Sequence, residues 1–200
     1  MSSKTVYIKL IGDALIPILG FFFWNWSLYF IVLFYILDLL VREALVHFKT
    51  KKLQTYSEKV IPNDWILNGV KSGFLLVSLL TLVHILILFL HPNILFKEEI
   101  TYFLTYKEMG VPQGLVLIPL VVFIGYANYQ NEFIRPKLFS IIDFSSLWKI
   151  HLVELVLLIG CVLVCIAIAY MVKPPEWLYL VVIIGAISAY NYYSFKKGSE

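Results

Sequence analysis

Long apolar runs constrain the fold of this chain more than any other feature of its sequence. Most of them are about 17 to 25 residues long, the length at which an α-helix crosses a hydrocarbon core of roughly 30 Å. The runs are continuous rather than alternating, which excludes a membrane-spanning β-barrel. Hydrophobic residues make up 60% of the chain and charged residues only 14%, unlike soluble domains. We therefore expect an all-α integral membrane protein.

The apolar runs divide into six predicted spans within a single transmembrane domain, residues 1–200. The first two runs adjoin so closely that a turn has to separate them, and the segment from Trp24 to Ser27 suits this role. Asn25 favours a tight turn, Ser27 can cap the next helix, and tryptophan prefers the headgroup level. We expect a six-helix bundle with spans at residues 4–23, 26–48, 73–91, 115–129, 150–172 and 177–195, and short interfacial helices within 92–113 and 132–149.

Basic residues are unevenly distributed over the connections between these spans. Of the 16 Lys and Arg residues, all but Lys97, Lys107 and Lys173 fall on one side. Connections rich in Lys and Arg stay in the cytoplasm, so we predict a multi-pass protein of the bacterial inner (cytoplasmic) membrane with both termini cytoplasmic. The basic stretch 48–71 fits this topology, and it would also attract anionic lipid headgroups.

A few ionisable residues interrupt the apolar runs. Such groups are costly at membrane depth and usually face protein or a wet cavity. Three pairs of these residues are one helical turn apart, so that the two members of each pair share a helix face. Asp38 with Arg42 and Glu43 with His47 are i, i+4 pairs on the second span, and His151 with Glu154 is an i, i+3 pair on the fifth. The positions concerned are Asp13, Asp38, Arg42, Glu43, His47, His84, His151 and Glu154.

Three interpretations of these residues stay open. Imidazole and carboxylate groups are competent metal ligands, so Glu43, His47, His151 and Glu154 form a candidate metal or proton site. A proton relay for transport would use Asp38 and Arg42 with Asp13 or His84. The simplest interpretation is a polar seam in which charge pairs join helices.

Known catalytic motifs are missing from the sequence. A rhomboid-type serine site, a His-Glu-x-x-His zinc site, a Cys-x-x-Cys pair and a Gly-rich phosphate loop are all absent, so we name no catalytic residue and expect no cofactor. The basic residues are explained by topology, and no compact basic domain suggests nucleic-acid binding.

The opening hairpin resembles an uncharacterised family of bacterial multi-pass membrane proteins. The resemblance covers about the first fifty residues and departs at Asp38, where the family more often has Glu. It implies the hairpin topology and the importance of Tyr35 and Asp38, but no reaction. The residues that carry it are Pro17, Gly20, Trp26, Ser27, Tyr35 and Asp38.

Two functions are consistent with these features. The leading hypothesis is a non-enzymatic accessory or regulatory subunit of a larger membrane complex, with other membrane proteins as partners. The alternative is a small proton- or metal-coupled transporter or channel that uses Asp38 and its polar neighbours.

Overall fold

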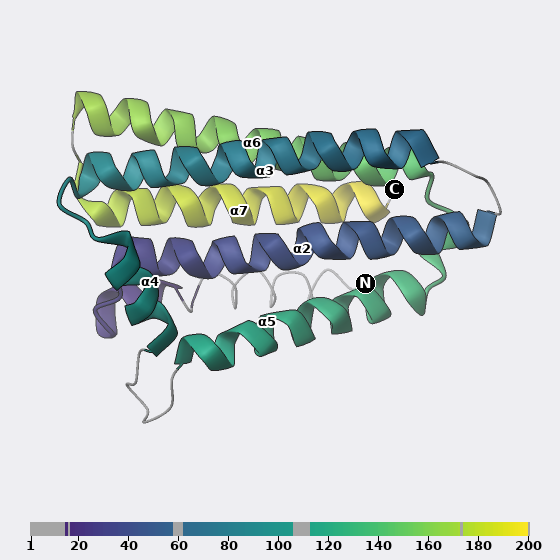
Figure 1. Cartoon of the computed structure of the whole chain (residues 1–200), viewed down its shortest axis with the longest axis horizontal. Coiled ribbons are helices and arrows are strands. Elements are labelled where there is room, and N and C mark those ends of the chain that lie inside the picture. The colour runs from purple at the N-terminus through teal and green to yellow at the C-terminus, as the bar shows by residue number, and fades with distance from the viewer. Residues whose placement is uncertain (1–14, 16, 58–61, 106–112, 173, 200) are drawn as a thin grey trace. The chain divides into compact units, whose positions relative to one another are not determined.

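The computed structural model describes residues 15, 17–57, 62–105, 113–172 and 174–199, and the regular structure within them is entirely helical (Figure 1). The expected all-α class is thus confirmed. The helices are α2 (Leu28–Ser57), α3 (Pro62–Leu90), α4 (Phe96–Thr105), α5 (Gln113–Tyr129), the π-helix η1 (Gln130–Ile134), the 3₁₀ turn η2 (Leu138–Ser140), α6 (Phe144–Met171) and α7 (Glu176–Ser199).

Three helical segments within the described residues are long and apolar enough to cross a membrane, namely Asp64–Leu90, Gly114–Ile134 and Phe144–Met171. A shorter apolar run, Glu176–Ala189, lies in α7. The 30-residue α2 has sufficient length, but Asp38, Arg42 and Glu43 interrupt its apolar sequence. The chain therefore has the helices of a membrane-associated protein, and its most polar long helix is α2.

The predicted turn between the first two apolar runs is present. Residues 17–23 are helical, the helix ends before Trp24, and Asn25 adopts a left-handed backbone with φ of 50°. The Ser27 hydroxyl accepts a hydrogen bond of 3.1 Å from the Phe30 backbone N–H, which satisfies one of the free donors at the start of α2. Gly20 makes this turn possible, because a Cβ there would lie 2.1 Å from the Trp26 ring.

The helices extend further than the apolar runs from which they were predicted. α2 continues to Ser57 rather than ending near residue 48, and α3 begins at Pro62 rather than at residue 73. An apolar run ends where polar residues begin, whereas the backbone hydrogen bonding of the helix continues through those polar residues. In α3 the first turn even gains from Asp64, since a carboxylate is favourable at a helix N-terminus.

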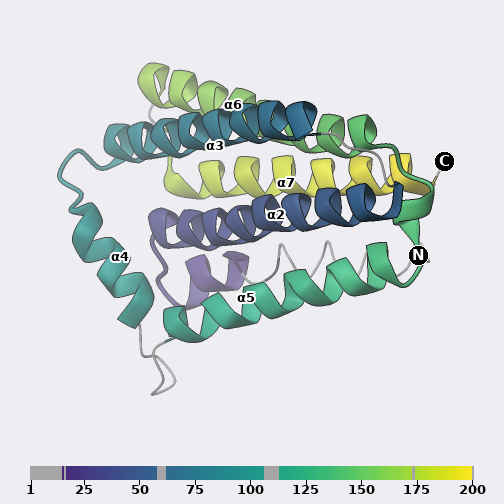
Figure 2. The ribbon, with the colours of Figure 1, turned by 45° about the vertical axis from the view of Figure 1, so that its right-hand side comes forward.

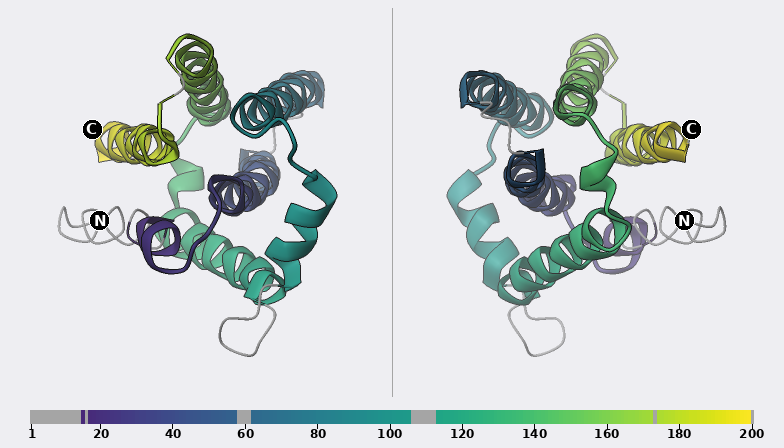
Figure 3. Two further views of the ribbon diagram at one scale, coloured as in Figure 1. Left: turned by 90° about the vertical axis from the view of Figure 1, so that its left-hand side faces the viewer. Right: turned by 90° about the vertical axis from the view of Figure 1, so that its right-hand side faces the viewer.

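The two predicted interfacial segments differ in outcome. A short helix does form within 92–113, as α4. Residues 132–149 form only the single 3₁₀ turn η2 as a separate element, because Pro136 cannot donate a backbone hydrogen bond and Lys137 turns the chain with φ of 56°. The segment instead comprises the end of η1, η2 and the first turns of α6, and Figure 3 shows η1 and η2 connecting α5 to α6.

The chain divides into two compact units whose boundaries fall inside α2, α3 and α6. The first contains residues 1–32, 79–94 and 156–200, and its buried side chains include Tyr29, Ile87 and Tyr179. The second contains residues 33–78 and 95–155.

Close helix contacts define the second unit. Figure 2 shows α4 beside the start of α5, where a Cβ on Gly114 would lie 2.0 Å from the Phe103 carbonyl oxygen. On α5, a Cβ on Gly125 would lie 2.7 Å from a methyl group of Val41 on α2. Small residues thus let α4 and α2 approach α5 closely.

Candidate functional site

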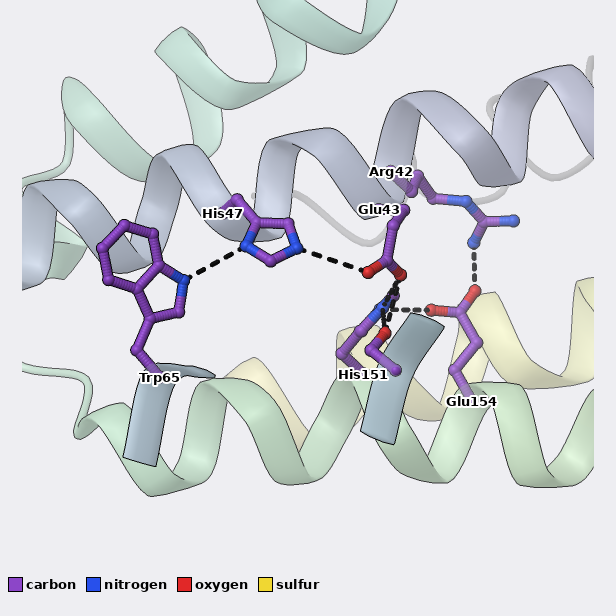
Figure 4. A network of polar contacts seen from close by, with 7 residues as sticks. Arg42, Glu43, His47, Trp65, His151 and Glu154 are labelled. Carbon is purple, nitrogen blue, oxygen red and sulfur yellow. Dashed lines mark hydrogen bonds and ion pairs between the residues drawn. The ribbon is translucent and has the colours of Figure 1, made fainter. Parts of the chain in front are cut away.

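Most of the ionisable residues singled out in the sequence gather in the second unit, in one cluster between α2, α3 and α6 (Figure 4). Helix α2 contributes two i, i+4 pairs, α6 contributes an i, i+3 pair, and α3 contributes two side chains that are seven residues, about two turns, apart. We call this set the polar cluster; it consists of Asp38, Arg42, Glu43, His47, Trp65, Ser72, His151 and Glu154.

Arg42 joins α2 to α6 at one end of the polar cluster. Its Nε lies 3.2 Å from Asp38 Oδ2, the predicted partner on the same helix. Its Nη1 donates to Glu154 Oε1 on α6, 112 residues further along the chain. The guanidinium is therefore shared by two carboxylates, through a hydrogen bond to Glu154 and through charge attraction to Asp38, which does not satisfy Nε as a donor.

Glu43, His151 and Ser72 form the centre of the polar cluster. His151 Nε2 lies 2.6 Å from Glu43 Oε2, and the Ser72 hydroxyl donates to that same oxygen at 2.7 Å. Ser72 Oγ also lies 3.0 Å from His151 Nε2 and can accept from it. Each of α2, α3 and α6 thus supplies one member of a closed hydrogen-bonded triangle.

His47 extends the polar cluster toward the start of α3. Its Nε2 lies 3.5 Å from Glu43 Oε1, and its Nδ1 lies 3.1 Å from the indole Nε1 of Trp65. An indole N–H can only donate, so His47 Nδ1 has to accept and carries no proton. His47 is therefore the neutral tautomer with its proton on Nε2, facing Glu43. Gly69 leaves room for the ring, since a Cβ there would lie 3.3 Å from His47 Cε1.

Burial varies along the polar cluster. The side chains of His151 and Glu154 are 4% and 7% exposed, whereas Asp38 at one end and His47 at the other are 44% and 39% exposed. Near the His47 end, the buried Thr50 Oγ1 and Trp148 Nε1 have no hydrogen-bond partner among the described residues. The polar cluster thus has a dry centre and two more accessible ends.

The polar cluster has more acidic than basic side chains. The cluster has three carboxylates, those of Asp38, Glu43 and Glu154, and one guanidinium, that of Arg42. His47 is neutral, because its Nδ1 accepts from the Trp65 indole. His151 Nε2 lies 2.6 Å from Glu43 Oε2, whereas Nδ1 lies 3.9 Å from Glu154 Oε2, beyond hydrogen-bond distance. A second proton on His151 would balance Glu43 and leave only Asp38, which is 44% exposed, in excess.

Ser72, His151 and Glu154 occur in the order of a hydrolase triad, but their geometry does not suit nucleophilic catalysis. Ser72 is fully buried and donates its proton to Glu43 rather than to His151. Glu154 Oε2 is beyond hydrogen-bond distance of His151 Nδ1, and the carboxylate is held by Arg42. Ser72 also lies within α3, where the backbone N–H groups bond to helix carbonyls and cannot form an oxyanion hole. The geometry of the polar cluster therefore does not suit acyl transfer.

The four residues of the predicted metal site, Glu43, His47, His151 and Glu154, do come together. Their atoms face one another and Arg42 through hydrogen bonds and ion pairs rather than converging on a common point. In the part of the chain that the structure describes, no group of three or more His, Cys, Asp or Glu side chains is arranged to hold a metal ion.

The remaining predicted residues lie elsewhere. His84 is in the first unit, where Nε2 lies 3.0 Å from the Tyr29 hydroxyl and Nδ1 lies 2.7 Å from the Leu80 carbonyl oxygen. Asp13 falls outside the described residues. Trp26 is buried in the hairpin turn, and Tyr35 on α2 is half-buried with its ring 5.9 Å from that of Phe34.

Sequence reasoning missed Ser72 and Trp65. A serine in an apolar helix carries no signal by itself, and a tryptophan near a helix start resembles an interfacial anchor. The only hint was their spacing of seven residues, which places both on the face of α3 that meets Glu43 and His47.

Comparisons with known proteins found no match to this chain among models of protein families, curated proteins or solved structures. The function of the polar cluster is therefore argued from its own geometry.

Proposed function

We propose that this chain is a multi-pass protein of the bacterial inner membrane with six spans and both termini in the cytoplasm. Three apolar helices and the Trp24 to Ser27 turn support the proposal, as does the concentration of Lys and Arg on one predicted side. The likeness of the hairpin to an uncharacterised bacterial membrane protein family is in line with it.

Within that membrane, we propose that the protein couples a proton to transport through the polar cluster. The observation that carries this proposal is that buried His151 lies beside two carboxylates, Glu43 and Glu154, of which Arg42 neutralises only Glu154. Burying an uncompensated charge costs several kcal/mol, and such sites are usually relieved by taking up a proton. A cluster that gains a proton in one state and loses it in another has the main requirement of a coupled carrier.

The path of the proton follows from the contacts. His47 is the accessible end of this path, and Glu43 connects it to His151 in the dry centre. Asp38 acts on the path only indirectly, through Arg42, which keeps its proton and holds Glu154. The neutral His47 presents its Nε2 proton to Glu43. Once Trp65 moves away, His47 can accept a proton at Nδ1 and then release its Nε2 proton to Glu43. Thr50 and Trp148, with their unpaired buried polar atoms, suit entry of water near this end.

Proton flux into liposomes tests this function. The full chain is reconstituted with a trapped pH-sensitive dye, and a potassium diffusion potential drives protons inward. We expect lumenal acidification with the wild type, loss of it with Glu43→Gln, and a reduced rate with Asp38→Asn. Glu98→Gln, on the exposed face of α4, is the matched control and is expected to behave as the wild type. Wild-type liposomes that do not acidify would remove the transport class.

A second candidate is an accessory or regulatory subunit without catalytic activity, assembled with other membrane proteins. The observation that favours it is the closed centre of the cluster, in which buried Ser72 and His151 are hydrogen-bonded to each other and buried Glu154 accepts from Arg42. Such a seam would hold α2, α3 and α6 together without moving. Crosslinking in cells followed by mild detergent extraction tests it, and a protein that migrates only as a lone monomer would argue against it.

A further inference from the structure

The two cysteines of the chain, Cys161 and Cys165, form a thiol pair on α6 within the first unit. They are i, i+4 neighbours, so their Cβ atoms are about 5–6 Å apart on one helix face. Their thiols are close enough to share a hydrogen bond. Cys165 is 1% exposed and Cys161 is half-buried. Two sulfur atoms therefore lie side by side, and one of them is more accessible than the other.

The hydroxyl of Tyr179, on α7 of the same unit, adjoins the thiol pair. Tyr179 is 1% exposed, and its Oη has no hydrogen-bond partner among the described residues. The hydroxyl interacts electrostatically with Cys165, which places it beside the sulfur atoms. A buried hydroxyl without a partner is costly, and a bound ion is one of the features that account for such a group. Packing alone explains the two thiols, but it does not explain this hydroxyl.

We propose that Cys161 and Cys165 bind one Cu(I) ion through their sulfur atoms, with the Tyr179 hydroxyl donating to the Cys165 sulfur. Soft thiolate ligands favour Cu(I). An ion about 2.3 Å from each sulfur, the length of a metal–thiolate bond, can bridge two side chains at this spacing. The ligand is the thiolate rather than the thiol, so binding releases one proton from each cysteine.

The charge and the number of ligands both favour a soft monovalent ion. Two thiolates with one Cu(I) leave one negative charge, and a buried anion of this kind needs a donor such as the Tyr179 hydroxyl. Zn²⁺ prefers four ligands, and in the part of the chain that the structure describes no third His, Cys, Asp or Glu joins the two cysteines. None of these residues belongs to the polar cluster, so the copper site goes beyond proton coupling and does not depend on it.

Competition for Cu(I) tests the site. The full chain in dodecylmaltoside micelles, reduced and kept under nitrogen, is titrated into the coloured complex of Cu(I) with bicinchoninate, and the loss of absorbance measures the copper that the protein takes. We expect one Cu(I) per chain, and Zn²⁺ should not displace it. Tyr179→Phe keeps the ring and removes only the hydroxyl. It should weaken binding about tenfold, because one hydrogen bond to a charged sulfur is lost.

A matched variant distinguishes the paired site from copper binding by any two thiols. Val164→Cys with Cys165→Val keeps two cysteines but moves one to a position that is 56% exposed, away from the shared face. It should weaken binding by about 100-fold or more, because the two thiols no longer act together on one ion. Cys161→Ser, at the half-buried position, should show the same loss, and it serves as the test if the shifted variant does not fold.

Met171→Leu is the control for sulfur outside the site. It removes a thioether that is 80% exposed at the end of α6, and it should bind Cu(I) as the wild type does. Wild-type affinity in the shifted-cysteine variant or in Cys161→Ser, unchanged affinity in Tyr179→Phe, displacement of copper by Zn²⁺, or equal weakening by Met171→Leu would each overturn the proposal.

Discussion

Replacing Arg42 by Met should reveal how much stability the polar cluster derives from its single guanidinium. The change leaves the carboxylate of Glu154, which is 7% exposed, without its cation. Breaking a buried ion pair by removing one partner costs about 3–5 kcal/mol. Arg42 is itself 28% exposed and partly screened, so we expect a loss of about 2–3 kcal/mol in the free energy of unfolding.

We expect most of the stability lost with Arg42 to come from its ion pair with Glu154 rather than from its ion pair with Asp38. Asp38 is 44% exposed, and ion pairs of that kind contribute about 0.2–1 kcal/mol. Combining Arg42→Met with Glu154→Gln removes both buried charges and should recover much of the loss. The coupling energy for residues 42 and 154 should be about 2 kcal/mol, and that for residues 38 and 42 below about 1 kcal/mol.

Equilibrium unfolding in dodecylmaltoside micelles titrated with sodium dodecyl sulfate, followed by circular dichroism, measures these free energies. Asp38→Asn, alone and combined with Arg42→Met, completes the second double-mutant cycle. The reasoning is refuted if the 38–42 coupling exceeds the 42–154 coupling, or if Glu154→Gln recovers nothing in the Arg42→Met background.

Three further predictions use the same unfolding measurement. Ser72→Ala removes the hydroxyl that donates to Glu43 and should lower the free energy of unfolding by about 1–3 kcal/mol, because the Glu43 carboxylate loses a donor. A loss below about 0.5 kcal/mol would contradict the hydrogen-bonded triangle of Glu43, Ser72 and His151. Gly20→Ala should cost about 1–3 kcal/mol because its Cβ would overlap Trp26, whereas Gly160→Ala, which meets nothing within 4 Å, should be neutral or stabilising by up to about 1 kcal/mol. Saturating Zn²⁺ should leave the unfolding midpoint unchanged, and an increase that disappears with Glu43→Gln would instead establish a metal site.

Local features of this fold could be predicted from sequence because neighbouring residues determine them. Asn25 and Ser27 have intrinsic turn and capping preferences, and both act as expected. The pairing of Asp38 with Arg42 follows from helix geometry alone. Helix ends were less predictable, because hydropathy reports the apolar part of a helix and not the extent of its hydrogen bonding.

The sequence grouped Glu43 and His47 with His151 and Glu154, and these residues do come together. The particular atom-to-atom contacts between helices could not be predicted, because they depend on how each helix is rotated about its axis. Nothing in the sequence connects Arg42 to Glu154 or Ser72 to Glu43 until α2, α3 and α6 are placed together. The closed centre of the polar cluster therefore emerged only from the structure. His84, predicted as a relay partner of Asp38, has hydrogen-bond partners in Tyr29 and Leu80 within the first unit.

The two partners of Arg42 have a consequence for biogenesis. Glu154 lies 112 residues after Arg42, so at about 5–20 residues per second the ribosome adds it about 6–22 s later. Asp38 precedes Arg42 by one turn and is available as soon as α2 forms. During that interval Asp38 is the one of these two carboxylates that is available to pair with Arg42. We therefore expect this weakly stabilising carboxylate of the finished protein to serve as an interim counterion during synthesis.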